Sequence, residues 1–121
     1  MGETSSNLYD AAKNPVLVIG LVRSYNCSVR LEWDEAKREA NLAKHQLDFA
    51  DAETVLSGDG LEFEDDREDY GEPRYVVYGF LRQYAVVLVY TPRAEAYRII
   101  SMRKATPYEE AELYRHLGYQ A

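Results

Sequence analysis

His45 and its neighbour Lys44 are the residues of this sequence best suited to moving a proton. Imidazole exchanges protons near neutral pH, and the ammonium group beside it adds positive charge. The stretch 31–49, LEWDEAKREANLAKHQLDF, predicts a helix that ends at these two residues. Lys37 and Asn41 fall on the same stripe of that helix, which makes the stripe polar and cationic. The pattern also fits an ordinary solvated helix face, on which the histidine caps the last carbonyls.

A second group of candidate site residues lies in segment 96–103, AYRIISMR, which predicts a strand. Arg98 and Arg103 have the planar guanidinium that binds two phosphate oxygens at once. Side chains alternate along a strand, so Ser101 and Arg103 share one face, and Arg98 takes the other unless a bulge re-aims it. We therefore expect Ser101 and Arg103 on an open face. Arg98 then reaches around an edge or forms an ion pair with a carboxylate.

The helix that positions His45 begins after Asp34, a good N-cap residue. Asp48 can cap a shorter helix, which the SGDG sequence at 57–60 ends, and a short strand is expected over 61–64. A stripe of small and apolar residues on the first helix predicts its packed face. The members of this stripe are Ala36, Ala40, Ala43 and Leu47.

Three long strands follow. Segments 74–81, 84–91 and 96–103 are rich in β-branched and aromatic residues, and the connections between them are short. The first two form a hairpin with a tight turn at residues 82–83, and short connections make all three strands an antiparallel meander. Gly79, inside the first of these strands, indicates a bulge or a close approach by another part of the chain.

A last helix is predicted from its start and stop signals. Thr106 and Glu109 have the spacing of a capping box, Pro107 takes the first helical position, and Gly118 ends the helix. The predicted fold class is α+β, with the helices packed on one face of a three- to four-stranded antiparallel sheet. So few helices leave the other face of the sheet open.

Charge is distributed unevenly along the 121 residues, a length that fits one domain. The net charge of -7 argues against a nucleic-acid partner at first. Residues 1–73, however, contain 7 basic and 17 acidic side chains, whereas residues 74–121 contain 7 basic and 4 acidic ones. The later half therefore suits an anionic ligand. The acidic run at 62–72 fits a solvated loop or a binding site for a basic partner segment.

Cysteine and histidine usage bears on the compartment and on metal binding. Cys27 is the only cysteine, which excludes an intramolecular disulfide and favours a reducing cytoplasm. His45 and His116 lack the spacing of a zinc site, and we expect no metal or other cofactor. Segment 15–22, PVLVIGLV, is shorter than the roughly 20 residues that span a bilayer and lacks the basic start of a secretion signal. No membrane association is expected.

Two blocks of the sequence resemble the BrnT family, ribonuclease toxins of bacterial toxin-antitoxin pairs. The first, E-W-D-x-x-K-x-x-x-N-x-x-K-H, covers residues 32–45, and the second, R-I-I-S-M-R-K-A-T, covers residues 98–106. The resemblance extends over about 31–114. Gln46 stands where the family usually has glycine, and Met102 where it usually has alanine. Glycine at position 46 would suit a left-handed helix end.

The resemblance implies a fold related to that of the RelE-type toxins and a metal-independent endoribonuclease. In such a reaction the ribose 2′-hydroxyl attacks the adjacent phosphate, with an acid, a base and cations assisting. The candidate catalytic residues are Lys44, His45, Arg98, Ser101 and Arg103. The candidate RNA-binding residues are Lys37, Asn41, Arg67, Arg74, Tyr90, Arg93 and Lys104.

The resemblance also implies a partner, a BrnA-like ribbon-helix-helix antitoxin, through which alone the complex contacts operator DNA. The toxin domain is expected over 29–121, after an atypical and partly mobile N-terminal extension at 1–28, with Val29 as an alternative start of translation. A hypothesis from another class is a catalytically decayed module that only binds an antitoxin or another protein. The overall acidity and the changes at Gln46 and Met102 favour that alternative.

Overall fold

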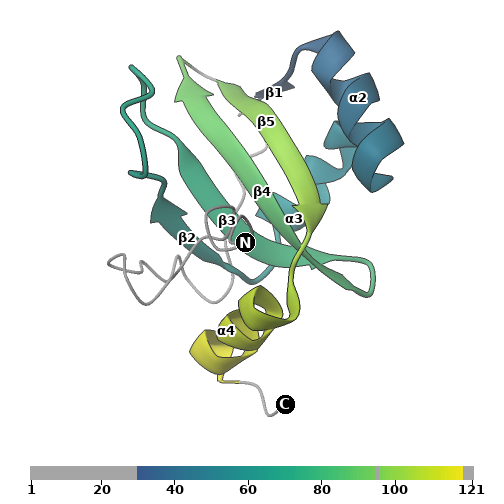
Figure 1. The fold of residues 1–121 in the computed structure, drawn as a ribbon, viewed down its shortest axis with the longest axis vertical. Coiled ribbons are helices and arrows are strands. Elements are labelled where there is room, and N and C mark those ends of the chain that lie inside the picture. Colours follow the sequence, from purple (N-terminus) through teal and green to yellow (C-terminus); the bar gives the residue numbers. More distant parts are fainter. Residues whose placement is uncertain (1–29, 95, 119–121) are drawn as a thin grey trace, which may run out of the picture.

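A computed structural model describes residues 30–94 and 96–118, so the predicted extension at 1–28 lies outside the described residues. Figure 1 shows the longer strands side by side, with helices around them. In chain order the elements are β1 (Arg30–Glu32), α2 (Glu35–His45), the 3-10 helix η1 (Phe49–Asp51), α3 (Ala52–Leu56), β2 (Leu61–Glu64), β3 (Tyr75–Leu81), β4 (Tyr84–Arg93), β5 (Ala96–Lys104) and α4 (Pro107–Leu117).

The sheet has five strands in the order β1-β5-β4-β3-β2. Neighbouring strands are antiparallel except that β1 pairs with β5 in parallel, with Leu31 opposite Tyr97. The α+β class is therefore confirmed, and the expectation of a purely antiparallel sheet with three to four strands is wrong. Sequence patterning missed β1 because three residues are too few to show the alternation that marks a strand.

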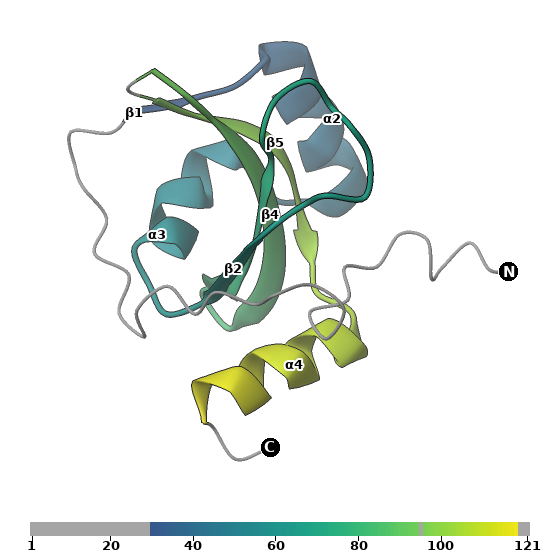
Figure 2. The ribbon, with the colours of Figure 1, turned by 90° about the vertical axis from the view of Figure 1, so that its left-hand side faces the viewer.

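Helices pack on both faces of the sheet (Figure 2). On one face, Phe49 of η1 and Leu56 of α3 share a core cluster with Leu88 of β4. On the other face, Leu113 of α4 packs with Tyr78 of β3 and others. The prediction that helices cover one face only is wrong because β3 and β4 contain runs of consecutive buried residues, which need cover on both sides.

Caps mark the predicted starts and stops of the helices. The Asp34 carboxylate accepts hydrogen bonds from the backbone N–H groups of Ala36 and Lys37 at the start of α2. Asp48 caps η1, and α4 starts with the predicted capping box. Gly118 ends α4 in the left-handed region, at φ 82°. These predictions from the sequence are confirmed.

The predicted packed face of α2 is wrong for its alanines, whereas Leu47, which follows the helix, is buried in the core as expected. The alanines are exposed, at positions 36, 40 and 43, and the buried residue of the helix is Asn41. The reason is that α2 lies against the polar edge of a strand and not on an apolar sheet surface. The Asn41 amide donates to the Met102 carbonyl of β5 at 2.9 Å and accepts from the Met102 N–H at 3.3 Å.

Gly79 allows a close approach between β3 and α3. A Cβ atom at this position would lie 2.9 Å from Cγ1 of Val55, closer than real atoms pack. The close approach predicted from the sequence is therefore present, and the neighbouring group is the Val55 side chain. In the described part of the chain, no helix combines the length and the hydropathy that crossing a membrane requires.

Candidate active site

The C-terminal end of α2 is fixed beside the C-terminal half of β5 (Figure 1). Besides its two bonds to Met102, the Asn41 amide donates to the carbonyl of Leu47 at 3.1 Å, just after the helix. One side chain thus satisfies backbone groups from two segments. His45 follows Asn41 by four residues, so both side chains lie on the same face of α2.

His45 is partly buried at this junction, and its pKa is lowered from the ordinary 6.5. Burial is the largest cause, followed by the positive charges of Lys44 and Arg103. Arg103 is therefore close enough for its charge to act on the imidazole. A lowered pKa keeps the ring neutral at pH 7, and a neutral imidazole can accept a proton.

A β-bulge in β5 places the two arginines on the same face of the sheet. Between Tyr90 and Val89 of β4 the register shifts, so that Ile100 is the extra residue of β5. Arg98 lies opposite Thr91, and Arg103 lies opposite Val87, four residues away on β4. Residues at even spacing on a strand share a face. A bulge therefore turns Arg98 to the face of Arg103, which is the exception that the sequence analysis allowed for.

Ser101 shares the face with the two arginines, because it lies opposite Val89. It is partly buried on β5, two residues before Arg103. The prediction that Ser101 and Arg103 share a face is therefore confirmed. The expectation that this face is open is wrong, because Val87 and Val89 on the same face pack in one buried cluster with Leu113 of α4.

Arg98 forms the ion pair that was expected as one alternative. Its Nε donates to Oε2 of Glu32 on β1 at 3.2 Å, and about a third of each side chain is exposed. Because Arg98 and Arg103 lie opposite residues four positions apart on β4, their Cα atoms are roughly 13 Å apart. Arg98 therefore does not join His45 and Arg103 around one phosphate group.

Arg103 is held by a carboxylate that the sequence analysis identified only as a helix cap. Its Nη1 and Nη2 atoms donate to the two oxygens of Glu109, both at 2.8 Å. Glu109 is fully buried and also accepts from the backbone N–H of Thr106 at 2.9 Å. The bulge and this bidentate pair set the direction of the guanidinium. Capping-box spacing showed where Glu109 is, but nothing in it indicated that the same side chain binds Arg103.

Exposed lysines lie at both ends of α2 and at the end of β5. Lys37 and Lys44 are exposed on α2, and Lys104 is exposed at the end of β5, with its Nζ 4.2 Å from the centre of the Tyr84 ring. Tyr84 is itself exposed at the start of β4, the strand that pairs with β5. The exposed lysines and the aromatic ring form a surface that fits an anionic, partly aromatic ligand.

Three of the arginines predicted to bind RNA lie elsewhere, at the end of the sheet where β3 begins and β4 ends. Arg67 pairs with the buried Asp65 at 2.9 Å, and Arg93 pairs with Glu72 at 3.3 Å. The guanidinium of Arg74 lies over the Tyr70 ring, 4.0 Å from its centre. The acidic loop 64–73 lines a hollow here. The structure thus does not bring these arginines to His45.

Tyr90 lies in the core and is only 3% exposed. Its ring stacks on that of Tyr97, with centroids 4.5 Å apart, and lies 5.7 Å from that of Tyr75. Stacking on a base would require this ring to leave the core. Contact between Tyr90 and RNA therefore stays a prediction.

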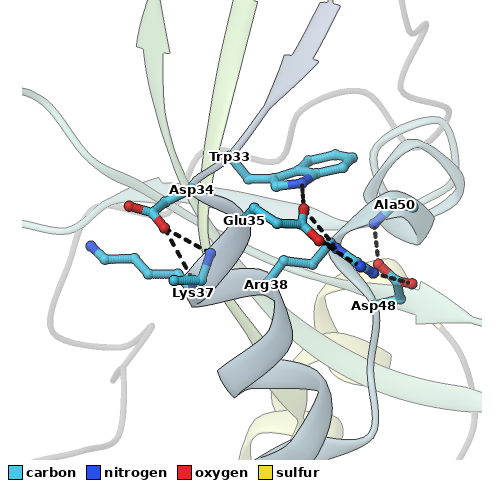
Figure 3. A network of polar contacts seen from close by, with 8 residues as sticks. Trp33, Asp34, Glu35, Lys37, Arg38, Asp48 and Ala50 are labelled. Atoms are coloured by element: carbon cyan, nitrogen blue, oxygen red, sulfur yellow. Dashed lines mark hydrogen bonds and ion pairs between the residues drawn. The ribbon is translucent and has the colours of Figure 1, made fainter.

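A polar network at the other end of α2 holds the helix that carries His45 (Figure 3). Arg38 donates to Glu35 at 2.7 Å and to Asp48 at 2.9 Å, and the indole N–H of Trp33 donates to Glu35 at 3.2 Å. The hydrogen bonds from Arg38 lower the pKa of Glu35. The pKa of Asp48 is lowered first by the N–H of Ala50 and then by Arg38. Sequence reasoning missed Arg38, because its partners lie on two separate segments.

Comparison with known proteins agrees with the two sequence blocks. The family model described as "Ribonuclease toxin, BrnT, of type II toxin-antitoxin system" matches residues 33–109, more than half of the 121 residues. The match runs from Trp33 of the polar network to Glu109, the partner of Arg103. No curated protein matches the chain. The chain belongs to the BrnT family of ribonuclease toxins from type II toxin-antitoxin systems.

Proposed function

We propose that this chain is an endoribonuclease that cuts RNA without a metal ion, through attack of a ribose 2′-hydroxyl on the adjacent phosphate. Membership of the BrnT family implies a ribonuclease toxin with an antitoxin partner. The observation that carries the proposed mechanism is that a partly buried histidine, one helical turn after Asn41, is held beside the strand segment that contains Arg103, because Asn41 bonds to the neighbouring Met102. A proton acceptor beside a phosphate-binding group is what this reaction requires.

In the proposed reaction, His45 takes the proton of the 2′-hydroxyl as the oxygen forms a bond to phosphorus. Arg103 and Lys44 stabilise the negative charge that develops on the phosphorane oxygens. The bond from phosphorus to the 5′-oxygen then breaks, and the departing oxygen takes up a proton from water. The hydroxide that is left takes the proton held by His45, which returns the imidazole to its neutral form. The products are a 2′,3′-cyclic phosphate and a 5′-hydroxyl, so atoms and charge balance without an additional reactant.

The RNA strand is proposed to follow the exposed cations at this end of the fold. Lys37 adds an exposed cation at the start of α2 and Lys104 adds one at the end of β5, and Arg98 is placed to contact a phosphate further along the strand. Asn41 supports the site through the backbone of β5, since its amide is already engaged there. The α+β architecture is compatible with the proposed relation to RelE-type toxins.

The antitoxin is proposed to be a BrnA-like ribbon-helix-helix protein that acts in the cytoplasm and supplies the contact with operator DNA. Its binding would neutralise the growth inhibition that RNA cleavage causes. The family match supports an antitoxin partner, and the class of that antitoxin is part of the proposal.

A second candidate function is a non-catalytic module that only binds an antitoxin or another protein. The observation in its favour is that four arginines predicted for the site each pair with a carboxylate. The pairs are Arg67 with Asp65, Arg93 with Glu72, Arg98 with Glu32 and Arg103 with Glu109. Such pairing offsets positive charge that RNA binding would otherwise use.

Incubation of the purified protein with single-stranded RNA in EDTA separates the two functions. We expect a ladder of fragments ending in 2′,3′-cyclic phosphates, and we expect its formation to slow by about 100-fold or more in Lys44→Ala, His45→Ala and Arg103→Ala. Arg82→Ala, at the exposed turn between β3 and β4, is the matched control and should cleave as the parent does.

Intact RNA together with tight binding to a ribbon-helix-helix antitoxin would favour the non-catalytic module. A ladder that disappears in EDTA would contradict metal independence. Unchanged cleavage by all three alanine variants would show that the site lies elsewhere.

A further inference from the structure

Glu109 is the most deeply buried carboxylate beside the candidate site. Its side chain is 0% exposed, yet it lies in the first turn of α4, which also contains the exposed Tyr108. Removing a carboxylate from water is unfavourable unless hydrogen bonds and an opposite charge compensate it. Here three donors do so, the Thr106 N–H and the two terminal nitrogens of Arg103.

A capping box alone does not require this arrangement. The reciprocal bonds between Thr106 and Glu109 need only the backbone N–H of each residue and one side-chain oxygen of each. Replacing a buried ion pair by apolar residues is often neutral for stability, so a buried pair is weak evidence of a stabilising role. The bidentate contact with Arg103 therefore calls for another explanation.

We infer that Glu109 is a positioning residue, whose buried carboxylate fixes the plane of the Arg103 guanidinium beside His45 for contact with the scissile phosphate. This inference rests on the proposed function. Two parallel N–H···O bonds define the orientation of both planar groups, which a single bond would not do. Glu109 in turn is fixed by the first turn of α4, where Pro107 follows the N-cap Thr106.

Glu109 acts on the orientation of the Arg103 guanidinium and not on the charge available to RNA. Glu109 offsets part of the positive charge of Arg103, so it does not strengthen the binding of RNA. Its contribution is to the transition state, because a preorganised cation stabilises developing charge without reorientation. Loss of the carboxylate should therefore reduce kcat and leave a freer cation, which binds RNA at least as tightly as before.

Glu109→Gln is the variant that tests this role. The amide is close in shape, and its carbonyl can still accept from the Thr106 N–H, so the cap is retained. We expect kcat on single-stranded RNA to fall by about 10-fold or more and KM to fall or stay constant. The dependence of KM on salt should become steeper, by a slope of about 0.7 for one additional phosphate contact on a single strand.

Thr106→Ala is the matched control. It removes the hydroxyl that accepts from the Glu109 N–H but leaves the ion pair with Arg103 in place. We expect a lower Tm with unchanged kcat, KM and salt dependence at temperatures where the protein is folded. Glu109→Asp, which keeps the charge but shortens the side chain, should lower kcat with the salt dependence of the parent.

Unchanged kcat in Glu109→Gln and Glu109→Asp, with cleavage abolished in Arg103→Ala, would overturn the positioning role and leave the proposed function intact. A fall in kcat that is matched by Thr106→Ala would also overturn it, because helix capping would then be the cause. If the parent protein leaves RNA intact, the proposed function fails, and this inference fails with it.

Discussion

His45 lies where two neighbouring cations act on its charge state. Burial, Lys44 and Arg103 all disfavour the imidazolium, so its pKa lies below 6.5 in the folded protein. A lowered pKa increases the fraction of neutral ring at pH 7, which can accept a proton, but it also makes this ring a weaker base than an ordinary imidazole. A cationic phosphate-binding group and a basic histidine thus work against each other when they are close, and the lowered pKa is a result of that closeness.

The pH dependence of cleavage tests this pairing. A base must be deprotonated to act, so kcat/KM should rise with pH and level off above a midpoint lower than 6.5. Lys44→Ala removes one of the positive neighbours and should move the midpoint of the residual activity upward, toward 6.5. Arg82→Ala should leave it where it is. A parent midpoint at or above 6.5 would contradict the proposed role of His45 as the base.

At the scale of elements, α2 is the helix on which the site depends, and its two ends are held by different means. The start is held by hydrogen bonds to the Asp34 cap and by the hydrogen bonds of Arg38 to Glu35 and Asp48. The end is held by the Asn41 amide and stops at Gln46, which has φ 63°. That conformation is unfavourable for a residue with a Cβ atom.

Gln46→Gly should stabilise the protein. Glycine adopts the left-handed conformation without steric strain, and the helix-ending bond from the residue 46 N–H to the Leu42 carbonyl at 2.8 Å is retained. We expect the free energy of unfolding in urea to rise by about 1 kcal/mol. Gln83→Gly is the matched control, since Gln83 has no positive φ and should gain nothing. Equal effects of both changes would contradict this explanation.

Asn41→Ala should detach the end of α2 from β5. The Met102 N–H and the carbonyls of Met102 and Leu47 would lose their partner, and each unsatisfied buried group costs about 1 kcal/mol or more. We expect a loss of about 2–4 kcal/mol in the free energy of unfolding, with faster hydrogen exchange at the Met102 amide. The exposed Ala43→Ser should show neither effect. Slow exchange in Asn41→Ala would mean that another group protects this edge.

At the scale of the whole molecule, exposed lysines and the acidic loop lie at different places around the sheet. The end formed by α2 and the last residues of β5 has the exposed lysines, whereas the acidic loop 64–73 lies where β3 begins, with arginines paired to its carboxylates. The net charge of -7 therefore does not describe the surface near His45. An RNA strand is expected to approach from the end with the lysines.

Local patterns in the sequence predicted most of the fold. Caps such as Asp34 and Asp48, the bounds of β2 and the start of α4 depend on neighbouring residues, so they are visible in a single sequence. What the sequence could not show depends on contacts between distant segments: the short β1, the side of the sheet that α4 covers, and the use of Asn41 at a strand edge.

The candidate site likewise has features that the sequence predicted and features that depend on contacts between distant segments. The residue types and the two motifs identified His45 and Arg103, and the structure brings both to one junction. The bulge at Ile100 and the bond from Arg103 to Glu109 arise from pairing and packing, and neither has a signature in the composition of β5. Arg67, Arg74 and Arg93 were grouped with the site by their charge and by the resemblance to the BrnT family, and neither gives a position in space.

The Asn41 amide joins residues that are 61 positions apart in the chain, and β1 likewise pairs with the last strand. During synthesis, α2 leaves the ribosome long before β5 exists, so neither partner can hold it in place. Contacts of such long range form late and slowly. A nascent or prematurely terminated chain that ends before β5 consequently has His45 but lacks Arg103, the arginine that we propose binds phosphate. Under the proposed function, cleavage of RNA therefore requires that β5 has been translated and has joined α2.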